Sequence, residues 1–220
     1  MYRLHFTPDA ASLAVRLVLE ELGLPYEARL LDRAAGEAQS DAYRALHPLG
    51  LIPVLETPDG PMFETAAILL YLADKHGGIA PAPADPDRAQ FLKWLFFIAH
   101  NIHPTLLQLF YPDRTAGPGC APQVLDHAEA RMRTLLTIFD RMLAAERPQW
   151  FAADRPSMLV HYLGLLLRWL AAPGPRHSFR FPTADYPAIR AVLLAHEARP
   201  AALKAAEAES LGPSLFTDPA

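Results

Sequence analysis

The sequence has little cysteine, little charge and no long hydrophobic run. Its 220 residues include a single cysteine, Cys120, which excludes an internal disulfide and agrees with a reducing compartment. No apolar run approaches the roughly 18 to 20 residues that cross a bilayer, and the opening MYRLHFTPDA lacks the basic-then-apolar layout of a signal peptide. We therefore expect a cytoplasmic protein without a membrane span, in which Cys120 is a free surface thiol.

The charge balance gives no reason to expect nucleic acid or an anionic membrane as a partner. Only 20% of the residues are charged, and the formal net charge is -4. A hydrophobic content of 51% is typical of a globular protein. The length allows one large domain or two smaller ones, and either can bury a sizeable core.

The first part of the chain alternates strand and helix patterns. We expect a strand at 2–7, a helix at 13–23 ending at Gly23, a strand at 25–31, a short irregular helix within GEAQSDAYRALHP, a hairpin around the turn PDG at 58–60, and a helix at 64–76. This order indicates a compact α/β domain over residues 1–77.

The rest of the chain shows helical patterns. GGIAPAPADPDR (77–88) contains three prolines and two glycines, which predicts a linker at 78–86. An all-helical domain is expected over 87–220. Its helices are predicted from Pro86 to Tyr111 with a kink or break at Pro104, over about 123–146, over 157–170, and from about Asp185 to before Pro200. The segment 157–170 is nearly all apolar and should lie at the centre of this domain.

Three segments in this order resemble glutathione S-transferases. TPDAASLAVRLVLEELGLPYE (7–27) is similar to the pattern SPGACSLAPHIALEEAGLPYE of bacterial beta-class members, and HPLGLIPVLE (47–56) and FETAAILLYLAD (63–74) resemble two further family segments. The resemblance covers about residues 1–200. It implies a thioredoxin-like N-terminal domain followed by an all-α domain, glutathione as co-substrate, a hydrophobic electrophile as second substrate, a role in detoxification and a homodimer.

Two of these segments have expected roles in holding glutathione. A proline inside a strand forfeits a ladder hydrogen bond. The resemblance implies a cis Ile52–Pro53 bond beside which the backbone of Val54 pairs with the cysteinyl part of glutathione; alternatively, Pro53 only marks an edge strand. Glu64 is expected to meet the γ-glutamyl amine, and Thr65, as a helix cap, the carboxylate. The alternative is a plainly capped helix with a solvated Glu64.

The thiol of glutathione must be ionised to act as a nucleophile. Lowering a thiol pKa from about 8.5 to about 6.5 requires roughly 2.7 kcal/mol of preferential binding to the anion. A hydrogen bond to a charged acceptor supplies about 1.5 to 3 kcal/mol, and a helix N-terminus about 0.3 to 1 kcal/mol. One hydroxyl at a helix start is therefore sufficient, and no metal is required.

The donor is expected near the first strand-to-helix junction. The beta-class cysteine aligns with Ala11, which argues against mixed-disulfide chemistry, and leaves Ser12 as the expected donor with Thr7 behind it. Phe6 takes the place of a beta-class tyrosine and cannot donate. Ser12 is also a residue type preferred at helix caps, so a purely structural role remains open, and a hydroxyl can fill both roles.

The helical domain is expected to contribute the remaining residues. His103 falls where the beta class has a histidine facing the sulfur; packing is its alternative role, and Asn101 lies nearby. His100 and His103 lack a third ligand at a sensible spacing, so no metal is expected. Arg33, or alternatively Arg44, lies near a family lysine that binds the glycine carboxylate. The second-substrate pocket is expected to include Phe6, Pro8, Phe97, Leu107 and Phe110.

Ser157 stands where a buried helix cap of the family begins. The acidic residue of a capping box is replaced by Val160, so half of that box is missing. The leading hypothesis is a glutathione transferase. The alternatives are a non-catalytic binding or interaction protein of the same fold, in which Ser12 is only a cap, and an isomerase or dehalogenase.

Overall fold

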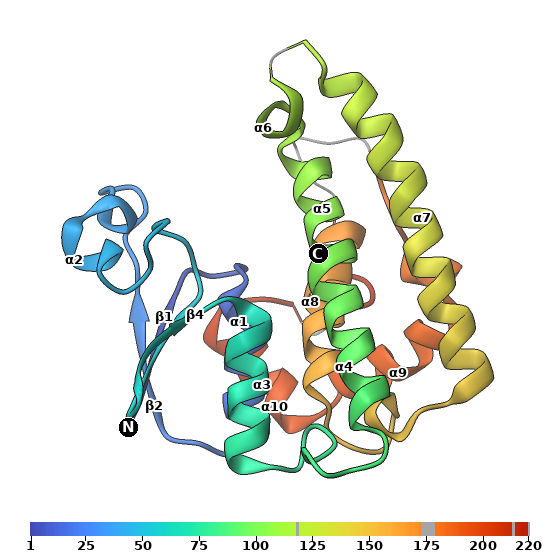
Figure 1. Cartoon of the computed structure of the whole chain (residues 1–220), viewed down its shortest axis with the longest axis horizontal. Helices are drawn as coiled ribbons and strands as arrows, with labels where there is room; N and C mark the ends of the chain where they lie inside the picture. Colours follow the sequence, from blue (N-terminus) through green and yellow to red (C-terminus); the bar gives the residue numbers. More distant parts are fainter. Residues whose placement is uncertain (118, 173–178, 213, 220) are drawn as a thin grey trace.

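A four-stranded mixed sheet forms the N-terminal part of the computed structural model, which describes residues 1–117, 119–172, 179–212 and 214–219 (Figure 1). The strands are β1 (Tyr2–Phe6), β2 (Tyr26–Leu30), β3 (Val54–Thr57) and β4 (Gly60–Phe63), in the order β2-β1-β3-β4. β1 runs parallel to β2 and antiparallel to β3, and β3 and β4 form the predicted hairpin. Pro58 and Asp59 make its turn, because Thr57 pairs with Gly60.

Two helices pack between the sheet and the helical part of the molecule. They are α1 (Ser12–Glu21) and α3 (Thr65–His76), which contact each other, while α1 also contacts β1. Leu4 of β1, Leu17 of α1 and Ile68 of α3 are fully buried in the shared core. The connection from β2 to β3 contains two short helices, η1 (Glu37–Gln39) and α2 (Asp41–Arg44).

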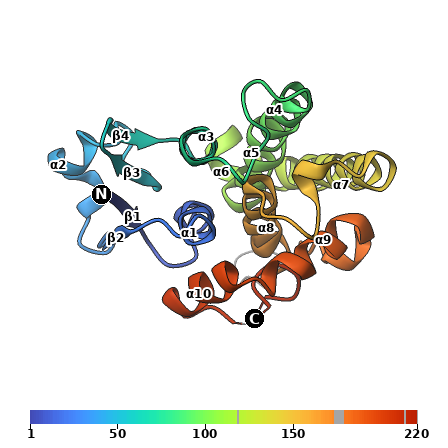
Figure 2. The same ribbon diagram turned by 90° about the horizontal axis from the view of Figure 1, so that it is seen from below.

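Helices make up the remainder of the described chain. They are α4 (Arg88–Phe97), the π-helical turn η2 (Ile98–Ile102), α5 (His103–Phe110), α6 (Pro112–Ala116), α7 (Ala121–Glu146), η3 (Gln149–Phe151), α8 (Met158–Ala171), η4 (Thr183–Asp185), α9 (Pro187–Glu197) and α10 (Pro200–Ala208). Residues 77–87 join α3 to α4 without helix or strand. In Figure 2, α10 lies beneath α1, and the two helices are in contact.

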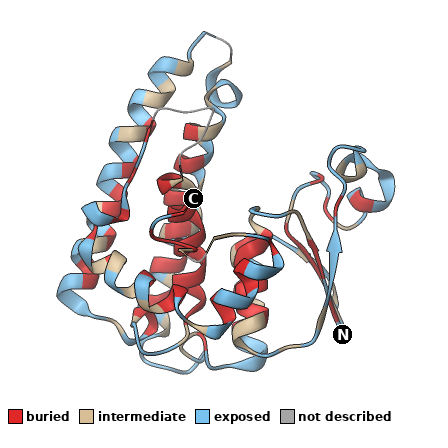
Figure 3. Ribbon diagram, turned by 180° about the vertical axis from the view of Figure 1, so that it is seen from behind, coloured by how far each residue is buried: buried red, intermediate tan, exposed pale blue. Residues whose placement is uncertain are grey.

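The expected thioredoxin-like fold with a helical C-terminal region is confirmed, and α8 lies at its centre (Figure 3). Leu163, Leu166 and Leu170 of α8 are fully buried. Ser157 is the residue before α8, yet its hydroxyl makes no cap bond and donates to the Trp150 carbonyl at 2.6 Å. Residues 118, 173–178, 213 and 220 of the expected domain 87–220 lie outside the described residues.

Some helix boundaries differ from the predictions. The break expected at Pro104 lies just before this residue, in the π-helical turn η2, which interrupts the α-helical hydrogen-bond pattern. Pro104 itself is tolerated in the first turn of α5, because backbone N–H groups at that position need no intrahelical acceptor. The helices α6 and α10 were not predicted. Helix α6 begins at Pro112 and helix α10 at Pro200. In the sequence each proline reads as the end of the preceding helix, although proline is also favoured at the first position of a new one. Within the described ranges, no helix has the length and hydropathy that a membrane crossing requires.

Candidate active site

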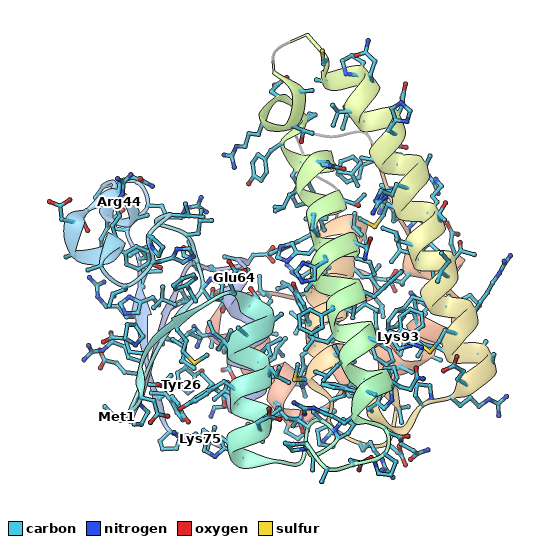
Figure 4. All side chains as sticks on the ribbon, in the orientation of Figure 1. Met1, Tyr26, Arg44, Glu64, Lys75 and Lys93 are labelled. Carbon is cyan, nitrogen blue, oxygen red and sulfur yellow. The ribbon has the colours of Figure 1, made fainter. Side chains whose placement is uncertain are left out.

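A pocket of about 380 Å³ opens between the start of α3 and the α4–α5 segment. It brings Glu64 and Thr65, expected to bind glutathione, together with His103, expected to act on its sulfur. Figure 4 shows Glu64 at the end of α3 that faces α5, at the junction between the sheet and the helical part. The other lining residues are Ala66, Ala67, Leu70, Leu95, Phe96, Ala99, His100 and Tyr162.

The start of α3 is strained. Glu64 occupies the cap position with φ +70°, a region that non-glycine residues rarely adopt. The prediction that Thr65 caps this helix is wrong: Thr65 is its first residue, 5% exposed, and neither side chain makes a cap hydrogen bond. The first N–H groups of α3 therefore have no side-chain cap and can receive an anion. Strain of this kind persists at ligand sites because the surroundings hold it in place.

His103 is held by Tyr162, a residue that the sequence analysis did not single out. The Nδ1 atom of His103 and the Tyr162 hydroxyl are 2.8 Å apart, and the rings meet edge to face. Burial lowers the pKa of His103 to about 4, so the ring is neutral at pH 7. Burial, and then the Glu64 charge, raise the pKa of the Tyr162 phenol. The phenol thus keeps its proton, and it can either donate to Nδ1 or accept from it, depending on the tautomer of the imidazole.

The two hydroxyls that were candidates for thiol activation lie at the junction of β1 and α1, Thr7 on the loop and Ser12 as the first residue of α1. The expected cap role of Ser12 is wrong, because α1 begins at Ser12 and Ala11 is the cap residue, without a side-chain cap bond. Ser12 is fully buried, and its hydroxyl donates to the Thr7 carbonyl at 3.4 Å. The Oγ1 atom of Thr7 is buried and has no hydrogen-bond partner among the described residues.

The Ile52–Pro53 peptide bond is cis, as expected. Val54 lies inside the sheet, where it pairs with His5 of β1 and Phe63 of β4. The expected pairing of its backbone with a ligand would therefore compete with the sheet ladder. Ile52 is half-buried and lies just outside β3. Its backbone is thus the available one beside the cis bond.

Among the described residues predicted for catalysis or glutathione binding, Glu64, Thr65 and His103 line the pocket, whereas the others do not: Ser12, Thr7, Ile52, Pro53, Val54, Arg33 and Asn101. Arg33 is exposed in the loop after β2, and Figure 4 shows Arg44 on α2, away from Glu64. The guanidinium of Arg44 hydrogen-bonds Gln39. The amide oxygen of Asn101 accepts a hydrogen bond of 2.9 Å from Arg131 of α7, so this side chain is already engaged outside the pocket lining.

Comparison with known proteins agrees with this geometry. Residues 10–75 match the family description "Glutathione S-transferase, N-terminal domain". Glutathione S-transferase GST-4.5 of Xanthomonas campestris is 32% identical over 176 residues, which cover 78% of this chain and 84% of that protein. The chain belongs to the glutathione S-transferase family. Among solved structures of the family, a sphingomonad glutathione S-transferase complexed with glutathione has a TM-score of 0.77 and 30% identity, covering 96% of this chain and 100% of that one.

A beta-class glutathione transferase is also similar to this chain. The enzyme from Sphingomonas chungbukensis has a TM-score of 0.75 and 26% identity, covering 94% of this chain and 98% of that one. The likeness therefore extends over both the sheet and the helical part. Within the described chain, no group of three or more His, Cys, Asp and Glu side chains gathers as a metal site would require.

The residues expected for the second-substrate pocket of the transferase divide into two groups. Phe97 packs against Trp94 and Phe139, so it faces the interior of the helical part. Phe110 instead packs against Trp169 of α8, with ring centroids 6.4 Å apart. Trp169 reaches the β1–α1 loop, where its indole N–H donates to Asp9 at 2.9 Å.

The other expected pocket residues come from β1, the β1–α1 loop and α5. Pro8 is exposed on the β1–α1 loop, Leu107 is exposed on α5, and Phe6 lies under the guanidinium of Arg16, 4.4 Å from its ring centroid. Sequence reasoning missed Trp169 and Tyr162 because both lie in an apolar helix that reads as core. Their only sequence signal is that each side chain brings a polar group into that apolar helix, the Tyr162 hydroxyl and the Trp169 indole N–H. Such a group requires a hydrogen-bond partner when it is buried.

Proposed function

We propose that this protein activates the thiol of glutathione and joins it to a hydrophobic electrophile. The observation that carries the proposal is the pocket of about 380 Å³ that Glu64, Thr65 and His103 share. Glu64 would bind the γ-glutamyl amine, the first N–H groups of α3 its carboxylate, and the backbone of Ile52 the cysteinyl part. Arg33 is proposed for the glycine carboxylate and Pro53 and Val54 as support for Ile52, while Asn101 would have to leave Arg131 to reach the ligand.

The thiolate would be stabilised by neutral donors. In this proposal the Tyr162 phenol donates to Nδ1 of His103 and leaves the ring proton on Nε2, an atom that has no partner among the described residues and belongs to a side chain that lines the pocket. A neutral donor suits this task, because it favours the thiolate and keeps its own proton at pH 7. The Ser12 and Thr7 hydroxyls are further candidates if the loop turns them toward the sulfur.

In the reaction, the thiolate sulfur attacks an electrophilic carbon and a carbon–sulfur bond forms. Either the leaving group departs with its bonding electrons, or an addition product takes up a proton from water. The aromatic contact between Phe110 and Trp169 supports an apolar second substrate beside the β1–α1 loop. Conjugation of such electrophiles would serve detoxification.

A non-catalytic glutathione-binding protein is the second candidate. It is favoured by one observation: Ser12 is fully buried, and the Thr7 hydroxyl oxygen is buried as well. In that case the pocket would hold glutathione without lowering the pKa of its thiol.

We also propose a homodimer in the cytoplasm. Large apolar side chains remain exposed beside the pocket: Phe96 lines it, and Phe63 precedes Glu64 in the chain. A second copy would cover these side chains. Light scattering that gives a mass of one chain, 24.3 kDa, would contradict the dimer.

The decisive experiment is a pH titration of the ultraviolet thiolate absorbance of bound glutathione. The wild-type protein should show the band with an apparent pKa about one to two units below that of free glutathione. H103A should move this pKa upward, and S12A and T7A, measured in parallel, would reveal a hydroxyl donor. Calorimetric binding of glutathione without any thiolate band at neutral pH would favour the non-catalytic candidate.

A further inference from the structure

The β1–α1 loop turns at an acidic residue in a glycine-like conformation. Asp9 has φ +52°, in the left-handed region that favours glycine. The beta-class pattern SPGACS has glycine at the corresponding place, whereas this chain has TPDAAS. Aspartate adopts this conformation more readily than most non-glycine residues but less readily than glycine, and here hydrogen bonds hold both its backbone and its side chain.

Two residues of α8 hold the Asp9 carboxylate. Arg168 donates from Nε to Oδ1 at 2.9 Å and from Nη2 to Oδ2 at 3.2 Å, which is a two-pronged contact. The indole N–H of Trp169 donates to Oδ1 at 2.9 Å. The side chain of Arg168 is only 5% exposed and that of Asp9 is 37% exposed, so a buried guanidinium is paired with a carboxylate at the surface.

The segment after α10 holds the backbone of the same residue. The N–H of Asp9 donates to the Glu209 carboxylate at 2.9 Å, and the other oxygen of Glu209 accepts from Arg16 of α1 at 2.8 Å. Arg168 also donates to the Leu215 carbonyl at 3.2 Å. The loop is thus tied to three elements: α1, α8 and the end of the described chain.

This attachment holds the loop that contains Thr7 and leads to Ser12, the two candidate hydroxyls. Thr7 and Ser12 lie on either side of Asp9 in the sequence, and the Thr7 carbonyl accepts from the Ser12 hydroxyl. The Thr7 hydroxyl oxygen is buried and has no hydrogen-bond partner among the described residues, so the position of the loop decides whether it can reach a ligand atom. Trp169 also packs on Phe110, which connects the same loop to the aromatic contact beside it.

We propose that Asp9 is a positioning residue, which sets the loop so that the glutathione thiol is ionised there, through its contacts with Arg168, Trp169 and Glu209. The inference rests on the proposed function and deepens it. It predicts that the apparent pKa of the bound thiol depends on a carboxylate that does not itself touch the sulfur.

The test compares D9G, D9N and W169F by the thiolate titration. D9G keeps the observed backbone conformation without strain and removes the carboxylate. An effect of D9G therefore reports the lost contacts with Arg168 and Trp169 and not a change in backbone strain. We expect its thiol pKa to rise by about one unit, with a kcat at pH 6.5 about five- to tenfold lower. The KM for glutathione should change less than kcat. W169F, which loses only the N–H, should show a smaller shift in the same direction.

Stability is measured on the same variants, because D9G leaves Arg168 buried without its partner. The double variant D9G/R168M removes both charges and keeps much of the side-chain volume, so it should fold and still show the raised thiol pKa. D9N, which keeps an oxygen acceptor for Trp169, should restore part of the wild-type value. D218N, which breaks the ion pair of Asp218 with Arg190, is the matched control and should leave the thiol pKa unchanged.

The outcomes separate the two proposals. A wild-type thiolate band that D9G and D9G/R168M leave unmoved would overturn the role of Asp9 alone. A wild-type protein that binds glutathione without a thiolate band would overturn the proposed activation, and the role of Asp9 with it. An equal shift in D218N would show a general effect of charge and would also contradict the inference.

Discussion

The hydroxyl of Tyr162 lies 2.8 Å from the Nδ1 atom of His103, although 59 residues separate them in the sequence. The contact joins the first half of α8 to the start of α5 and, in the proposed arrangement, holds the imidazole proton on Nε2. Because burial lowers the pKa of His103 to about 4, this proposed donor is neutral at pH 7.

Removing the Tyr162 hydroxyl tests this arrangement. In Y162F the imidazole loses the donor that holds its proton on Nε2, and we expect kcat to fall about 3- to 12-fold, which corresponds to the loss of one neutral hydrogen bond. Steady-state kinetics with an aryl halide measures it. Y111F, in which an exposed tyrosine changes in the same way, is the control. Equal kinetics in Y162F and wild type would contradict the proposed tautomer.

Glu64 provides a prediction in which stability and binding change in opposite directions. In E64G the strain of a residue at φ +70° is relieved, so the free energy of unfolding should stay the same or rise by about 1 kcal/mol. Affinity for glutathione should fall about 10-fold or more, because a charged hydrogen bond is lost. Calorimetry and denaturant unfolding measure the two effects. R147G, at another positive φ away from the pocket, should gain similar stability without any loss of affinity.

His103 predicts a pH dependence of stability. Its pKa is about 4 in the folded protein and about 6.5 when unfolded, so the unfolded chain binds more protons between these values. The stabilising contribution is complete above pH 6.5 and is lost as the pH falls toward 4. We expect this residue to account for about 2 kcal/mol of lost unfolding free energy between pH 8 and pH 5.

Denaturant unfolding across pH 4 to 8 measures this contribution as the difference between wild type and H103Q. The variant should show a shallower decline, although His196, whose pKa burial also lowers to about 4, still contributes. Parallel curves for the two proteins would mean that His103 is not held neutral by the fold.

The Arg16–Glu209 pair predicts a large effect from single changes. Both side chains are almost fully buried, at 4% and 0% exposed. Removing one partner leaves a buried charge, so E209A should lower the unfolding free energy by about 3 to 5 kcal/mol. The double variant R16M/E209L should lose less than the sum of the single variants. D59N, which breaks the exposed ion pair with Lys75, should have a small effect.

Local patterns predicted the sheet and most helices, because periodicity and turn residues determine these elements directly. The strands at 2–7 and 25–31 and the helices at 64–76 and 157–170 agree with the structure to within a residue or two. The cis bond at Pro53 was expected from the resemblance alone. The helix α10 was missed because Pro200 reads as the stop of the preceding helix, although proline is also favoured at a first helical position.

Site residues could be predicted where they lie in a single recognisable stretch of sequence. Glu64 and Thr65 are adjacent in the sequence, and His103 lies in a recognisable segment; the structure brings all three to one pocket. The partners of these residues were not predictable, because they come from distant segments. Nothing local relates Tyr162 to His103, or Asp9 to Arg168 159 residues later. The cap roles of Ser12 and Thr65 were wrong, because each helix begins at the residue itself.

The pairing of Asp9 with Arg168 has an evolutionary consequence. With glycine at position 9, the buried Arg168 would keep its bond to the Leu215 carbonyl but lose its counter-charge, and without Arg168 the Asp9 carboxylate would lose its two-pronged partner. A substitution at only one of the two positions gives a protein of lower stability, so substitutions at positions 9 and 168 are expected to occur together. Among relatives, aspartate at the first position and arginine at the second should be inherited as a unit and lost as a unit.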